Sequence, residues 1–170
     1  MSTLLLKDTP YGSAMLIGIV GAITNTSLWG KRIDAILCFG TLLGVLWWYA
    51  SNVSALSIIS SYALKTAVGD TLAGKTDQTI YVIITLLVIG VCFLFIDTKS
   101  SQQWIGIGWL TLAQFICEWF DKNYDHIKFF RHRWLYEMTT AVLILTVTSS
   151  PLTLSTVRYD LVAVLFYRMS

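Results

Sequence analysis

The feature that most constrains this chain is a run of about thirty residues, 35–64, that contains no charged side chain. A helix rises about 1.5 Å per residue and the hydrocarbon core of a bilayer is about 30 Å thick, so roughly 20 apolar residues cross it. Three further uncharged runs are long enough for the same purpose, namely 9–30, 78–96 and 100–117. The pattern predicts an all-α integral membrane protein.

Composition supports this interpretation. Of the 170 residues, 55% are hydrophobic and only 13% are charged, whereas about 25% are charged in a typical soluble domain. The composition therefore predicts one small unit that is mostly surrounded by lipid and has no room for a separate catalytic domain. A net charge of +2 is too small to favour nucleic-acid binding.

Four transmembrane helices are expected, arranged as two antiparallel hairpins, because short polar links separate the first from the second and the third from the fourth. Residues 1–120 are predicted to form this bundle. The predicted spans are 11–30, 35–58, 79–96 and 102–119. A single helix over 35–64 would reach about 45 Å, so we expect that segment to tilt, to break or to leave the hydrocarbon.

The distribution of Lys and Arg predicts the orientation. Four spans place nine of these residues on one side and three on the other, whereas five spans give seven and five. Because cytoplasmic loops carry the excess of positive charge, four spans and two cytoplasmic termini are expected. The predicted location is a bacterial inner membrane.

The C-terminal segment, 138–170, leaves two interpretations open. Short β-branched runs between turn residues are typical of strands, and such a segment would be a cytoplasmic packing element. Alternatively, 138–157 is a fifth helical span followed by an interfacial end. In the first interpretation the apolar residues predicted to contact a partner are Leu161, Val162, Val164 and Phe166.

Small residues recur at helical spacing in two of the predicted spans. Such residues let two helix backbones approach closely. They either pack the first two helices together within one protomer or form an oligomer interface. The residues are Ala14, Gly18, Ala22, Gly40 and Gly44.

A polar stripe follows in the second half of the long run. It is formed by Asn52, Ser54, Ser57 and Ser61. Such a stripe can line a water path, can bond to its own helix, or can lie outside the hydrocarbon. It is the candidate lining of a small oligomeric channel or permease.

Residues 121–137 interleave basic and aromatic side chains, which predicts a segment lying on the inner membrane surface. The residues expected to meet lipid head groups are Lys128, Arg131, Arg133 and Trp134. Both histidines, His126 and His132, lie here, six positions apart. That spacing does not place them on one helical face.

The sequence favours a non-enzyme. No ionisable side chain is expected inside a span, and no motif of a hydrolase, a nucleotide-binding loop or a zinc site is present. We expect no cofactor and no metal. A less favoured catalytic set would be Glu118, Asp121, Asp125 and His126.

The expected function is that of a small polytopic membrane subunit that self-associates and anchors, senses or signals for a larger assembly. Bacterial defence, immunity or secretion systems are examples. The expected partners are membrane lipid, further copies of the chain and a soluble cytoplasmic protein, with no direct contact to nucleic acid. The alternative is the channel or permease described above.

Overall fold

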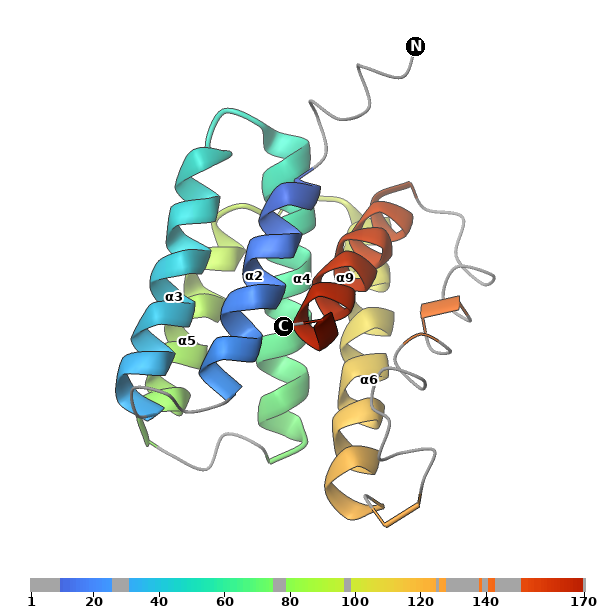
Figure 1. Ribbon diagram of the computed structural model, residues 1–170. Helices are drawn as coiled ribbons and strands as arrows, with labels where there is room; N and C mark the ends of the chain where they lie inside the picture. Colours follow the sequence, from blue (N-terminus) through green and yellow to red (C-terminus); the bar gives the residue numbers. More distant parts are fainter. Residues whose placement is uncertain are drawn as a thin grey trace.

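The computed structural model describes residues 10–25, 31–74, 79–96, 99–124, 126–127, 138, 141–142 and 151–169. Within these ranges every long regular element is a helix, so the all-α part of the prediction is confirmed. Figure 1 shows the helices packed into one bundle. They are α2 (Tyr11–Asn25), α3 (Lys31–Trp48), α4 (Val53–Leu72), α5 (Thr79–Phe93), α6 (Ser101–Asn123) and α9 (Pro151–Met169).

The predicted membrane spans are the main correction. Among the described residues, no helix combines the length and the apolar character needed to cross a bilayer. α2 and α5 have 15 residues each, which at about 1.5 Å per residue falls short of the hydrocarbon thickness. α3 begins with Lys31 and Arg32, and α4 contains Lys65 and Asp70. The predicted integral membrane protein with four spans, its inner-membrane location with cytoplasmic termini, and the channel are therefore wrong.

The long uncharged run is two helices rather than one. α3 ends at Trp48, a turn follows, and α4 begins after Asn52, whose side chain accepts a hydrogen bond of 3.0 Å from the Ala55 amide. An amide oxygen at this position satisfies one of the free N–H groups of the first helical turn. The break at 49–52 ends the predicted 35–58 span, and α4 then continues as far as Leu72. Because α4 is an additional helix between α3 and α5, the predicted arrangement of two antiparallel hairpins is wrong.

Glycines mark the places where three pairs of helices approach each other most closely. A Cβ at Gly18 on α2 would overlap the Ala163 carbonyl on α9. A Cβ at Gly106 on α6 would overlap the Thr153 hydroxyl, which is also on α9. A Cβ at Gly69 on α4 would lie 2.8 Å from the Cβ of Gln114 on α6. Real side chains essentially never come so close, so only glycine fits these three positions.

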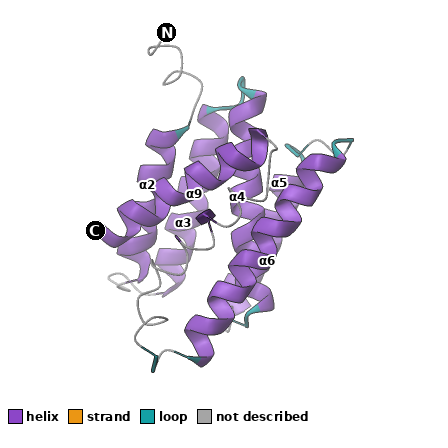
Figure 2. Cartoon of the chain, turned by 90° about the vertical axis from the view of Figure 1, so that its right-hand side faces the viewer, coloured by secondary structure: helices purple, strands orange, loops and turns teal. Residues whose placement is uncertain are grey.

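The C-terminal segment is helical where the structure describes it, which corrects the predicted strands. Pro151 occupies the first helical position, where its missing N–H and fixed φ are well tolerated. In Figure 2 the resulting helix, α9, crosses the bundle obliquely between α2 and α6. Its buried residues recur every three or four positions, as expected for one helix face. They are Thr153, Thr156, Val157, Tyr159 and Ala163. Half of the proposed fifth helix over 138–157 lies outside the described residues, and its last seven residues belong to α9.

Candidate functional site

Lys65 is the centre of the candidate site. It lies in the middle of α4, is only 4% exposed, and its ammonium reaches two other helices. Its Nζ lies 2.7 Å from Oδ2 of Asp160 on α9 and donates a hydrogen bond of 3.1 Å to Oε1 of Gln114 on α6. A buried ammonium needs such partners because removing it from water is costly. One lysine thus connects three helices.

Gln114 extends this network to two further carboxylates. Its amide nitrogen donates to Oδ1 of Asp70 at 3.2 Å and to Oε1 of Glu118 at 2.9 Å. The amide is therefore oriented by its surroundings, with its oxygen toward the cation and its nitrogen toward the anions. Glu118 follows Gln114 by one helical turn and is fully buried. We call Lys65, Asp70, Gln114, Glu118 and Asp160 the polar network.

The polar network contains one cationic side chain and three carboxylates. Two of the carboxylates, Asp70 and Asp160, also line a cavity. In a low-dielectric interior, charges interact more strongly than in water. The described lining of the cavity contains two acidic groups, Asp70 and Asp160, and the ammonium of Lys65.

Tyr62 lies beside the lysine and contacts a second tyrosine. The Nζ of Lys65 lies 5.1 Å from the centroid of the Tyr62 ring, within the range of a cation–π interaction. The Tyr62 ring in turn meets Tyr159 edge-on, with centroids 5.2 Å apart. Tyr159 is fully buried, and this burial raises the pKa of its hydroxyl far above the ordinary value. The phenol therefore stays neutral, and its ring supports Tyr62, which does line the cavity described below.

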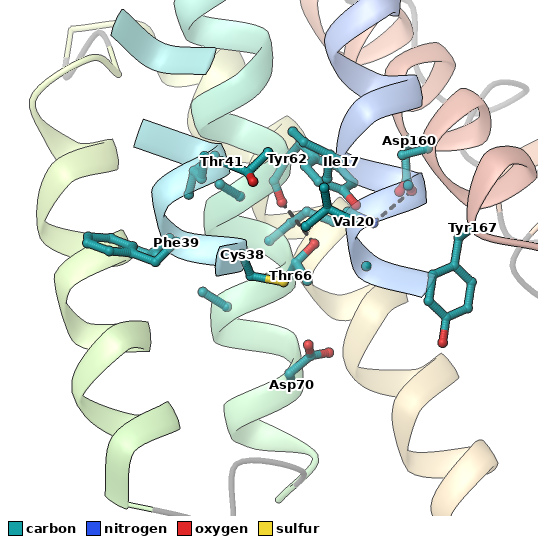
Figure 3. Close-up of a pocket in the computed structure, with 18 of the residues that line it drawn as sticks. Ile17, Val20, Cys38, Phe39, Thr41, Tyr62, Thr66, Asp70, Asp160 and Tyr167 are labelled. Carbon is teal, nitrogen blue, oxygen red and sulfur yellow. Dashed lines mark hydrogen bonds and ion pairs between the residues drawn. The ribbon is translucent and has the colours of Figure 1, made fainter. Parts of the chain in front are cut away.

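A cavity of about 380 Å³ opens beside the network. Figure 3 shows Asp70 projecting toward the other labelled lining residues, Asp160 beside its ion-pair bond to Lys65, and Tyr167 further along the same helix as Asp160. Most of the remaining lining is apolar or aromatic, with contributions from α2, α3, α4, α5 and α9. Examples are Ile17, Phe39, Leu42, Ile84, Val88 and Val164. A mostly apolar cavity of this size with a few convergent polar groups is typical of small-molecule sites.

The predicted small-residue positions divide into two groups. Ala14 is fully buried and Gly18 packs on α9, while Ala22 is partly buried; this surface is therefore used inside the protomer. Gly40 and Gly44 lie on the outside of α3, where an added Cβ would meet nothing within 4 Å. The small residues of α2 therefore pack against α9 and not only against α3.

The predicted polar stripe does not line the cavity. Asn52 caps α4, Ser54 is exposed, and the Ser61 hydroxyl donates to the Ser57 carbonyl of its own helix at 2.6 Å. Ser57 and Ser61 are buried in the helical core. Hydroxyls that bond to the preceding turn are satisfied locally. The residues of α4 that do line the cavity lie further along the helix, from Tyr62 onward.

The residues predicted to contact a partner are on α9. Val162 packs on the largest buried cluster, Leu161 packs on a smaller one, and Val164 lines the cavity. Phe166 is partly buried. Much of this surface is therefore used within the chain.

The predicted head-group residues, Lys128, Arg131, Arg133 and Trp134, lie outside the described residues, as do Asp125 and His132. Of the less favoured catalytic set, Glu118 is buried in the polar network, whereas His126 is exposed, with its ring centroid 6.0 Å from that of Tyr124. The structure does not place these two side chains in a common site.

The sequence reasoning missed the polar network. It expected charged residues only at the ends of apolar segments, yet Lys65 and Glu118 are both buried within helices. One signal was available: Gln114 and Glu118 lie one turn apart on α6, a spacing that places two polar side chains together. Asp160 could not have been paired with Lys65 because it lay in a segment predicted to form strands. No family model, curated protein or solved structure matches this chain.

Proposed function

We propose that this chain is a non-catalytic binding protein whose cavity takes a small organic cation with an apolar body, such as an alkylammonium ion. The observation that carries the proposal is the pair of carboxylates, Asp70 and Asp160, that line the cavity beside Lys65, whose ammonium is the one cation among the described lining residues. This proposal adds a class of ligand to the predicted sensing subunit. A role of that subunit in a defence, immunity or secretion assembly stays a prediction.

The charges of the described lining support a cationic ligand. Lys65 is already held by Asp160 and Gln114, so an anionic ligand would have to compete with a carboxylate for it. A ligand ammonium, by contrast, would lie beside Asp70, where its positive charge would offset the charge of that carboxylate. Aromatic faces from Phe39, Tyr62 and Tyr167 are well suited to the rest of such a ligand.

The test is isothermal titration calorimetry with matched series of alkylammonium ions, alkyl carboxylates and alcohols. We expect the ammonium ions to bind, and affinity to rise with chain length until the apolar part of the cavity is filled. Asp70→Asn keeps the shape of the side chain but removes its charge, and should weaken ammonium binding about tenfold, or about 1.4 kcal/mol.

Asp121→Asn is the matched control. Asp121 is an aspartate on α6, and it is absent from the described cavity lining, so its substitution should leave the affinity unchanged. Equal binding of carboxylates and ammonium ions, or an Asp70→Asn variant that binds as well as the parent, would contradict the proposal. Failure of all three series to bind would also contradict it.

A further inference from the structure

The outer side of α3 carries an uncharged apolar surface with two glycines at its centre. Gly40 and Gly44 lie one turn apart, and a Cβ at either position would meet nothing within 4 Å. Large exposed side chains stand on both sides of this shallow trough. We call these residues, together with the two glycines, the α3 face; they are Ile33, Ile36, Leu37, Leu43, Trp47 and Trp48.

α5 extends the α3 face. The two helices pack against each other, on the side of the bundle away from α6 and α9 (Figure 1). The described residues of α5 include no charged side chain. Its exposed apolar residues are Val82, Ile83, Leu86, Leu87 and Phe93, and Leu94 follows directly after the helix.

This apolar surface is larger than the scattered apolar residues of an ordinary protein surface. Trp47 is 83% exposed and Trp48 is 80% exposed, so these two rings alone present on the order of 300–400 Å². A monomer rarely exposes a contiguous apolar patch larger than a few hundred Å². With the aliphatic residues of α3 and α5, the surface reaches the order of 800 Å² that each partner buries in a standard interface.

We infer that the α3 face is a homodimer interface, in which α3 of one copy crosses α3 of a second copy at Gly40 and Gly44. A partner for this surface must itself be uncharged, because a charged group would lose its water without gaining an opposite charge. The chain supplies such a surface itself. A two-fold axis through the glycines would place the bulky residues of each copy beside the trough of the other.

The proposal is tested by sedimentation equilibrium of the full chain over a wide concentration range, in a density-matched non-ionic surfactant. The parent should form a dimer. Gly40→Leu and Gly44→Leu should each raise the dimer dissociation constant at least tenfold. Both substitutions enter open space and replace a poor helix former, so each monomer should unfold at a urea concentration no lower than that of the parent.

Gly108→Leu on α6 is the matched control, because an added Cβ at Gly108 also meets nothing within 4 Å and the site lies on a different helix. It should leave the dimer intact. The proposal is overturned if the parent stays monomeric with its apolar surface covered by surfactant, or if Gly44→Leu dimerises like the parent. Gly108→Leu weakening the dimer as much as Gly44→Leu would also overturn it. Calorimetry of Gly44→Leu with alkylammonium ions keeps this result separate from the proposed ligand binding.

Discussion

Lys65 and Asp160 are 95 positions apart in the chain, yet their charged atoms lie 2.7 Å from each other. The side chains are 5% and 19% exposed, respectively, so the pair is largely withdrawn from water. A contact of this kind depends strongly on both partners, because each charge left alone would remain buried. The last described helix is thereby tied to the centre of the bundle.

Lys65→Met should destabilise the fold by about 3 kcal/mol, because it leaves Asp160 and the Gln114 carbonyl without the ammonium. Lys65→Met combined with Asp160→Leu should recover part of that loss, because no buried charge of the pair is then left alone. Urea unfolding of the single and double variants measures both effects. Lys122→Met is the control: this lysine is exposed and donates to the Gly74 carbonyl, so the change should stay within about 0.5 kcal/mol. Equal costs at the two lysines would contradict a structural role for the ion pair.

Two glycines of α2 should respond in opposite directions to the same substitution. Gly18→Ala forces a methyl group against the Ala163 carbonyl and should cost about 1–3 kcal/mol by overpacking. Gly12→Ala meets nothing within 4 Å and should be neutral or stabilising by up to about 1 kcal/mol, since alanine favours the helix. Urea unfolding compares the two variants, and limited proteolysis reports whether α9 detaches in Gly18→Ala. Similar unfolding midpoints would show that α2 and α9 are not in close contact.

Cys92 should make the fold less stable at alkaline pH. Burial raises the pKa of its thiol from 9.0 to about 12, although the Ser60 hydroxyl opposes part of this effect. The unfolded thiol therefore loses its proton above pH 9 while the folded thiol keeps it. The resulting stabilisation is complete below pH 9 and is lost as the pH rises toward 12, by at most about 1.4 kcal/mol per pH unit.

Cys92→Ala removes this titration. The difference in unfolding free energy between the parent and Cys92→Ala, measured by urea unfolding, should shrink by about 1 kcal/mol between pH 8 and pH 10. Cys38→Ala provides the comparison at a less buried thiol. A difference that stays constant with pH would contradict the burial of Cys92.

The helical class and the approximate positions of three helices could be predicted from the sequence. The apolar runs over 11–30, 79–96 and 102–119 overlap α2, α5 and α6 because long apolar stretches bounded by polar turns favour helices in any apolar environment. The prediction that these same stretches cross a bilayer was wrong. An uncharged run alone does not distinguish a side chain that faces lipid from one that faces a neighbouring helix.

The polar network depends on tertiary contacts that no local pattern contains. Lys65 lies beyond the predicted 35–58 span, and a break at an unspecified point was only one of the alternatives for the long run. Once α4 starts at Val53, Lys65 falls near its middle and faces α6 and α9. Asp160 completes the pair only if the C-terminal segment is helical, and its β-branched residues favoured strands. Packing on α2, α4 and α6 overrides that local preference.

The dependence of the ammonium on α9 has a consequence for biosynthesis. Ribosomes deliver the chain from its N-terminus, so α4 emerges well before the helix that supplies the counterion of Lys65. Until α9 arrives, the half-built bundle must leave this lysine hydrated and Gly18 uncovered. Nascent chains stalled before Asp160 should therefore be loose enough for quality-control proteases to recognise.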